Sequence, residues 1–159
     1  MSLLNKEPVQ RVQKTIQDFN SELKVLVLET SARTAREAAN SLNCEVGAII
    51  KSLLFRTEKS FVLCLVSGDK KCSLNKIKKI TFKKDISMAN PEEVKNQTGY
   101  TIGGVSPVGH IKPVDIMIDN SLNRFNDLYG AAGHPNCVFK INFKDLIKIT
   151  KGKSMDITE

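Results

Sequence analysis

A loop of ten residues, 101–110, holds the densest group of residues that could take part in chemistry: three glycines, a serine, a proline and a histidine. The adjacent Gly103 and Gly104 would let a ligand come within hydrogen-bonding distance of the backbone amides. Pro107 fixes its own φ and restricts the residue before it, so the loop should be stiff. A stiff loop with exposed N–H groups suits a carbonyl oxygen or a developing negative charge. The same residues could instead form a tight turn between a helix and a strand.

Lys51 is a second candidate, because it interrupts an otherwise apolar run. Strand alternation places it on the same face as Ile49, Leu53 and Phe55. A lysine on an inward face is costly unless an anionic or carbonyl group meets its ammonium, and a substrate phosphate or carbonyl could do so. The alternative is a lysine whose stem packs while its head reaches water.

Several other catalytic patterns are missing from the sequence. Ser106 lacks the second glycine of a nucleophile elbow, and neither a Walker lysine nor a dinucleotide-binding glycine pattern is present. Asp115 and Asp127 are isolated carboxylates at expected strand ends. His110 and His134 lie in glycine-rich turns and could border one cleft, although loop histidines are commonly surface residues. We therefore expect no hydrolase triad.

The four cysteines have neither CxxC spacing nor a histidine at ligand distance, so the sequence predicts no zinc site, no disulfide framework and no cofactor. No run approaches the roughly 18–20 apolar residues of a membrane span. The first ten residues are too polar for a signal peptide. Together with the unpaired cysteines, this leads us to expect a cytoplasmic protein without a membrane partner.

Lysines account for most of the net charge of +7. The segment 70–84 contains no acidic residue and seven lysines: Lys70, Lys71, Lys76, Lys78, Lys79, Lys83 and Lys84. A second group lies near the C-terminus, over residues 140–153. Such clusters attract phosphate backbones, with an affinity that falls as salt rises. Ordinary solvated helix faces would explain the same pattern.

The elements that must position these groups follow from hydrophobic periodicity. Helices are expected over 5–20, from Thr34 onward, around 74–80, between an Asn90 cap and Gly99, and from Asn142 to Gly152. Strands are expected over 24–29, 47–55, 60–66, 114–118, 127–133 and 136–141. The strand 60–66 is apolar on both faces and should be central. The sequence thus predicts one α/β (α+β) domain over 1–159, with its core at 24–151 and a mixed sheet of about six strands.

Three motifs, in this order, resemble the YbaK family, also known as the prolyl-tRNA-synthetase-associated domain: Ile50–Phe55, Gly103–His110 and Asp127–Pro135. The resemblance extends from about Val25 to Ile149. It implies a partly barrel-like sheet surrounded by helices. It also implies a metal-independent enzyme that hydrolyses the ester between a wrong amino acid and the 3′ end of a tRNA, commonly proline tRNA carrying alanine or cysteine.

The resemblance also implies roles for individual residues. Lys51, Gly103 and Gly104 would be catalytic, with Lys51 as the family's active-site lysine and the glycine loop holding the aminoacyl ester. Substrate binding would fall to Ser106, Pro107, Gly109, His110, Asp127, Gly130, Gly133 and His134. The acceptor stem would be steered by Lys70, Lys71, Lys76, Lys78 and Lys79.

An aminoacyl ester is already activated, so a positioned water and a place for the oxyanion could suffice without a triad. A ribose hydroxyl of the substrate is the implied helper group. The expected partners are aminoacylated tRNA and, beyond it, an aminoacyl-tRNA synthetase. A non-catalytic tRNA- or RNA-binding module would use the same cleft and lysines, and a small-molecule pocket protein would make the lysines incidental.

Overall fold

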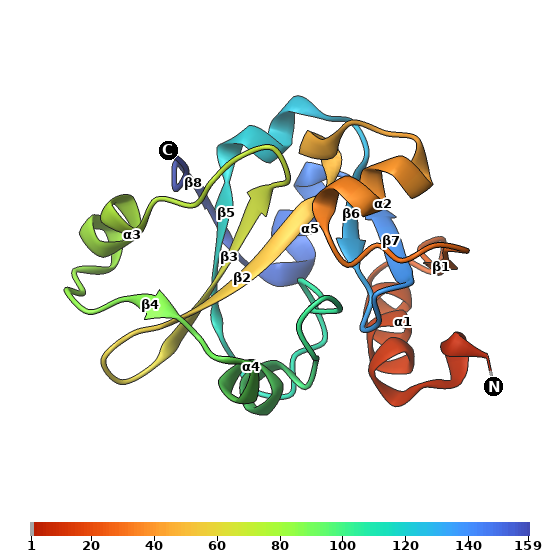
Figure 1. Ribbon diagram of the computed structural model, residues 1–159, viewed down its shortest axis with the longest axis horizontal. Helices are drawn as coiled ribbons and strands as arrows, with labels where there is room; N and C mark the ends of the chain where they lie inside the picture. Colours follow the sequence, from red (N-terminus) through yellow and green to blue (C-terminus); the bar gives the residue numbers. More distant parts are fainter. Residues whose placement is uncertain (1) are drawn as a thin grey trace.

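A long antiparallel hairpin of β2 (Ile50–Arg56) and β3 (Phe61–Ser67) organises the computed structural model, which describes residues 2–159 (Figure 1). The hairpin belongs to a five-stranded sheet of order β4-β2-β3-β5-β8, and a three-stranded sheet has the order β1-β7-β6. β3 pairs with β5 in parallel and β5 with β8 in parallel, so the larger sheet is mixed, as predicted.

The other strands are short: β1 (Val25–Val27), β4 (Ser87–Met88), β5 (Asp115–Asp119), β6 (Leu128–Ala131), β7 (Cys137–Ile141) and β8 (Lys153–Met155). The helices are α1 (Glu7–Phe19), α2 (Ala35–Leu42), α3 (Leu74–Thr81), α4 (Pro91–Thr98) and α5 (Phe143–Thr150). Three 3-10 turns complete the described elements: η1 (Leu3–Asn5), η2 (Val46–Ala48) and η3 (Asn120–Arg124). No helix within residues 2–159 has both the length and the apolar character needed to cross a bilayer.

The sheets differ from the sequence-based expectation in two ways. Residues 2–159 form eight strands rather than about six, because the edge strands β4 and β8 are too short to show a period-two pattern. Instead of one partly barrel-like sheet there are two sheets, which within residues 2–159 are not closed into a barrel. An isolated bridge between Ile49 and Tyr129 links them.

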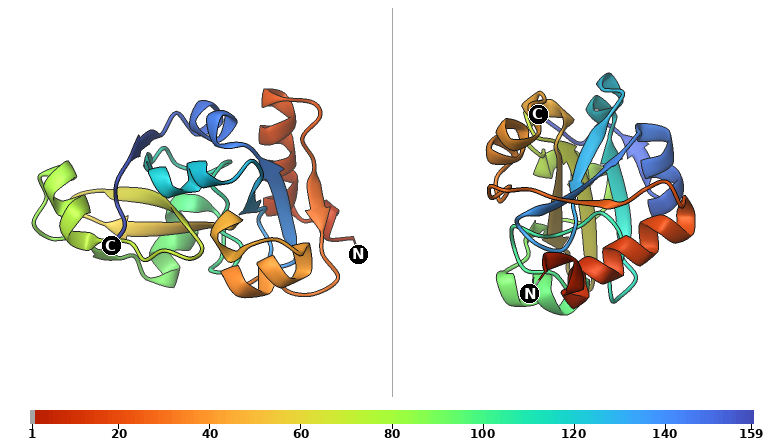
Figure 2. Two further views of the ribbon diagram at one scale, coloured as in Figure 1. Left: turned by 90° about the horizontal axis from the view of Figure 1, so that it is seen from above. Right: turned by 90° about the vertical axis from the view of Figure 1, so that its right-hand side faces the viewer.

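β3 is the central strand that its two apolar faces predict. On one face, Leu63 and Leu65 belong to the main core, which also contains residues of α1 and α5. On the other face, Cys64 and Val66 pack in a second cluster with Ile77 of α3. Figure 2 shows α1 and α3 at opposite ends of the molecule, with the β2–β3 hairpin between them.

α4 forms as its end signals predict. Asn90 and Glu93 make a reciprocal capping box, Pro91 occupies the first turn, and Gly99 ends the helix with φ +81°. The end of α5 differs from the prediction, because Lys151 and not Gly152 takes the left-handed conformation. Gly152 is needed for packing instead, since a Cβ there would lie 2.8 Å from Ile118 Cδ1.

Candidate functional site

A cavity of about 370 Å³ opens along the edge of β2, on the side where β4 pairs with Phe55 and Arg56 alone. Its walls come from residues 32–38 at the start of α2, from β2, from the end of β4, from the loop 102–105 and from β6. Most of the lining side chains are alanine, valine, leucine or isoleucine. A concave, largely apolar hollow with a few polar groups is the usual form of a small-molecule site.

Lys51 lines this cavity, and its ammonium donates a hydrogen bond to the Lys70 carbonyl. The side chain is half-buried, and this burial lowers the pKa of Lys51, while Cys72 and Asp69 act in the opposite direction. The group that meets the ammonium is thus a neutral carbonyl of the protein itself, where the sequence suggested a substrate phosphate or carbonyl, or water. A carbonyl is a weaker partner for a cation than a phosphate or carboxylate would be.

The two glycine-rich loops contact each other directly. The Gly104 carbonyl accepts from the Gly133 N–H at 3.0 Å, and the Gly104 N–H donates to the Thr101 carbonyl at 2.9 Å. Because the Gly104 amide already has an acceptor in its own turn, Gly103 is the glycine of the pair that lines the cavity. Gly103 has φ +96°, and a Cβ there would lie 3.1 Å from Arg33 Cγ.

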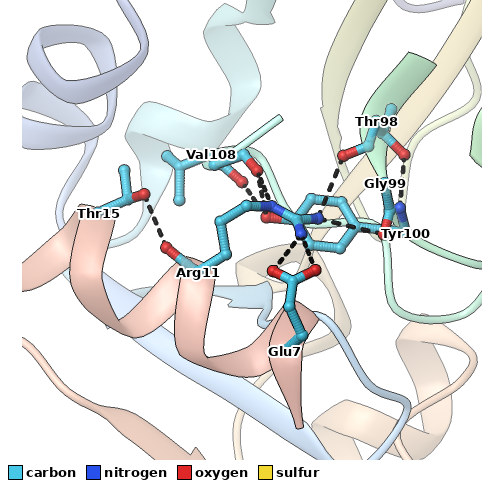
Figure 3. Close-up of polar contacts among 8 residues, drawn as sticks. Glu7, Arg11, Thr15, Thr98, Gly99, Tyr100 and Val108 are labelled. Carbon is cyan, nitrogen blue, oxygen red and sulfur yellow. Dashed lines mark hydrogen bonds and ion pairs between the residues drawn. The ribbon is translucent and has the colours of Figure 1, made fainter. Parts of the chain in front are cut away.

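A buried polar network holds the loop from behind (Figure 3). Arg11 of α1 donates through Nε to the Gly109 carbonyl at 2.6 Å and through a terminal nitrogen to the Gly99 carbonyl at 3.1 Å. The Tyr100 hydroxyl donates to the carbonyls of Val108 and Gly109, at 2.6 and 2.9 Å. Both ends of the loop are thereby fixed to one helix and to each other.

Four further candidates in this loop serve its internal structure and are outside the cavity lining. Ser106 is fully buried, and its carbonyl lies 2.7 Å from His110 Nε2. Burial lowers the pKa of His110. Pro107 packs on β6, where a Cβ at Gly130 would lie 3.1 Å from the proline ring, and a Cβ at Gly109 would lie 2.7 Å from the Tyr100 hydroxyl.

The candidates from the motif Asp127–Pro135 also divide into residues that line the cavity and residues that do not. Gly130 lines the cavity, whereas Asp127 is exposed and outside the lining. Gly133 packs on the backbone of Pro8, because a Cβ added to Gly133 would lie 2.7 Å from the Pro8 carbonyl carbon. His134 Nδ1 accepts from the Asn136 N–H at 3.0 Å, and burial lowers the pKa of His134.

The five lysines expected to steer tRNA lie in α3 and in the segment just before it. Lys76 makes an ion pair with Asp156 at 2.9 Å and donates to the Thr158 carbonyl at 2.6 Å. Lys70 provides the carbonyl that binds Lys51, and Lys71 is exposed beside it. Lys78 and Lys79 lie in the last turn of α3. The cavity lining includes Lys51 but none of these five.

Two polar residues of the cavity were missed by sequence reasoning. Ser52 lines it, and the Ser52 Oγ is buried without a hydrogen-bond partner in the described part of the chain. Arg33 lies exposed at the cavity wall, against Gly103. Ser52 lies in the motif Ile50–Phe55 but was given no role there, and Arg33 lies in none of the three motifs. Of the two tyrosines, Tyr129 lines the cavity, whereas Tyr100 is fully buried behind the loop.

Residues 2–159 contain no group of three or more His, Cys, Asp or Glu side chains arranged to hold a metal ion. The polar groups that line the cavity are the Lys51 ammonium, the Arg33 guanidinium, the hydroxyls of Thr34, Ser52 and Tyr129, and glycine backbone. Such a set can bind a carbonyl compound that carries a phosphate.

Residues 29–149 match the family model described as an aminoacyl-tRNA editing domain. The chain is 36% identical over 136 residues to the uncharacterized protein YwhH of Bacillus subtilis, covering 85% of this chain and 86% of that protein. It is 29% identical to the proline–tRNA ligase of Caldicellulosiruptor saccharolyticus over 79% of this chain, which is 22% of that enzyme. The chain thus spans about a fifth of this ligase.

Among solved structures, similarity is high to a crystal structure that carries the provisional description of a trans-editing enzyme for prolyl-tRNA synthetase. The TM-score is 0.91 at 37% sequence identity, and the match covers 97% of this chain and 98% of that one.

Proposed function

Since this chain belongs to the family of aminoacyl-tRNA editing domains, we propose that it is an aminoacyl-tRNA deacylase that removes a wrong amino acid from a tRNA. The observation that carries the proposal is the cavity at the β2 edge. Its apolar walls suit an amino-acid side chain, and its polar groups suit the ester and phosphate of a tRNA end. Its volume of about 370 Å³ is within the range of small-molecule sites.

In the proposed complex the aminoacyl group enters between Gly103 and Gly130. Water attacks the ester carbonyl, the oxygen of the water remains with the released amino acid, and the terminal ribose hydroxyl of the tRNA leaves with a proton. A neighbouring ribose hydroxyl of the substrate would help to place the water. The backbone at Gly103 would face the developing oxyanion, and no protein nucleophile is needed because the ester is already activated.

The two cations have separate parts in this proposal. Arg33, exposed beside Gly103, would meet the terminal phosphate in the planar geometry that guanidinium groups favour. Lys51 would exchange its carbonyl partner at Lys70 for the ester region or a phosphate oxygen, since an ionised acceptor is the stronger partner. Both cations would thereby act on bound substrate.

The relatives support a finer choice of substrate. Because matched relatives include proline–tRNA ligases, we propose tRNA for proline as the acceptor and alanine or cysteine as the amino acid removed. The action would take place in the cytoplasm on tRNA released by a synthetase. A small cavity discriminates weakly, since one methylene is worth only about 1–3 kcal/mol.

A panel of mischarged tRNAs tests the proposal. Wild-type protein should release the amino acid from at least one member, and Lys51→Ala should lower that rate about 100-fold or more. Lys144→Ala, at an exposed lysine of α5, is the matched control and should leave the rate unchanged. Circular dichroism checks that both variants are folded. Binding of tRNA without ester cleavage anywhere in the panel would identify a non-catalytic RNA-binding module and refute the deacylase.

A further inference from the structure

Phe82 is an apolar residue whose side chain is almost fully exposed, so it adds little to the stability of the fold. The residue follows α3 directly, and its side chain is 92% exposed, more than any other large apolar side chain of the described chain. Its φ of +59° is in the left-handed region, a position at helix ends that normally belongs to glycine or asparagine. A phenylalanine here therefore costs free energy twice, through backbone strain and through contact of the ring with water.

Residues on either side of Phe82, together with the end of β2 and the turn after it, line a second, polar hollow, and Phe82 itself lies outside that lining. This hollow is lined by Arg56, Lys78 and Lys84, together with the carboxylates Glu58 and Asp85. Lys79 and Lys83 are exposed next to it in sequence. Among the described residues, Lys78 and Lys84 make no ion pair, whereas Arg56 reaches Glu93 at 3.4 Å.

The two carboxylates, Glu58 and Asp85, make the hollow a poor binding site for a free phosphate ion. Their negative charges offset part of the positive charge of the lining and so weaken its attraction for phosphate. An aromatic ring that is exposed among lysines is instead the combination by which proteins hold unpaired nucleotides: the ring stacks on a base, and the cations follow the backbone.

The hollow is next to the cavity at the β2 edge. β4 separates the two, because Ser87 lines the hollow and the adjacent Met88 lines the cavity. Consecutive Cα atoms are about 3.8 Å apart, so a strand leaving the cavity would reach the hollow within a few nucleotides. Met88, whose side chain is 57% exposed, lies between the cavity and the hollow and offers the RNA strand a further apolar contact.

We propose that Phe82 and the hollow of Arg56, Lys78 and Lys84 form a second contact site for RNA, in which the ring stacks on an unpaired base upstream of the esterified nucleotide. This deepens the proposed function, because it assigns a contact to the single-stranded tail that the aminoacyl cavity leaves outside. A base on the ring would cover the apolar surface that water now contacts.

The test uses an uncharged RNA hairpin with the unpaired 3′ tail of a tRNA and 2-aminopurine in that tail. Binding is measured by anisotropy, and stacking by quenching of the 2-aminopurine emission. Phe82→Gly should weaken binding about tenfold and remove the quenching, yet raise the melting temperature, because glycine relieves the left-handed strain. Phe82→Trp should keep both signals.

Controls separate the site from general effects. Val27→Ala, at an apolar residue of β1 that is 47% exposed, should leave RNA affinity unchanged. A blunt hairpin without the tail should bind wild type and Phe82→Gly equally. Because the RNA is uncharged, the assay does not depend on ester hydrolysis, so failure of the deacylation panel and failure of this site can be told apart.

Two results would overturn the inference. One is equal tail affinity of wild type and Phe82→Gly. The other is a Phe82→Gly variant that binds RNA as the wild type does but no longer binds vesicles of anionic lipid. That result would assign the exposed ring to a membrane surface.

Discussion

Arg11 of α1 stacks on Tyr100, with the guanidinium carbon 4.7 Å from the centre of the ring (Figure 3). The same guanidinium binds the carbonyls of Gly99 and Gly109, one at each end of the glycine loop. A residue far away in sequence therefore sets the shape of a cavity wall that it does not itself line.

Loss of this clamp should loosen the loop without unfolding the domain. Arg11→Met keeps the stem but leaves the Gly99 carbonyl without this donor and the Gly109 carbonyl with the Tyr100 hydroxyl alone, so we expect unfolding to become easier by about 1–3 kcal/mol. Deacylation should fall mainly through kcat, because the ester is held less well. Urea unfolding and steady-state kinetics measure the two effects. Lys14→Met, at an exposed lysine of the same helix, is the control, and similar losses in both variants would contradict the clamp.

Ser52→Ala should have opposite effects on stability and on substrate binding. The Ser52 Oγ is buried without a partner in the described chain, so its removal should leave the free energy of unfolding equal or higher by up to about 1 kcal/mol. If the hydroxyl binds the aminoacyl group, KM should rise about tenfold at the same time. Thermal melting and kinetics with one mischarged tRNA decide the matter. A less stable variant with normal KM would assign Ser52 to the fold.

His110 should make the protein sensitive to acid. Burial lowers its pKa below the ordinary 6.5, so between the folded pKa and 6.5 the unfolded chain binds more protons than the folded one. Stability should therefore fall as pH falls through 6.5 towards the lower folded pKa. His110→Gln should flatten this dependence when urea unfolding is followed from about pH 7 to pH 5. His134→Gln is a useful comparison because burial lowers that pKa as well. An unchanged slope in His110→Gln would contradict the role of its burial.

Gly104→Ala should be poorly tolerated. An added Cβ would lie 2.8 Å from the His134 backbone nitrogen and 2.9 Å from the Gly133 carbonyl carbon, and backbone atoms cannot turn aside. We expect a loss of about 2–3 kcal/mol in unfolding free energy as the two loops are forced apart. Ala131→Gly, which removes a methyl group from the neighbouring strand, controls for general sensitivity. Wild-type stability of Gly104→Ala would show that the loops separate readily.

Local signals in the sequence predicted most of the helices and strands. The Asn90 cap and the Pro91 start place α4 at the right position, and the two apolar faces of β3 identify the central strand. Two-residue pairing at β4 and the division into two sheets depend on long-range contacts, which no local pattern encodes.

Three of the candidate site residues, Lys51, Gly103 and Gly130, line one cavity. Strand alternation singled out Lys51 and the glycine-rich loop singled out Gly103, whereas Gly130 was named only through the family motif. Ser52 lies in the motif Ile50–Phe55, but nothing local marks its hydroxyl as facing a cavity, and Arg33 before a helix cap carries no signature. Whether a loop residue faces a cavity or supports it from behind, as Ser106 does, depends on which helix packs against the loop.

The brevity of β4 has a consequence for how such a domain could lose or change its activity. Two more residues of ladder beyond Phe55 would cover the backbone of Leu54 and Leu53 and fill the cavity with the new strand's own side chains. Sheet edges of this kind invite invasion by foreign strands, and here the opening stays short and is walled by a helix and a loop. The cavity is open because this ladder ends early, and a small insertion before Ala89 would be the simplest way to close it.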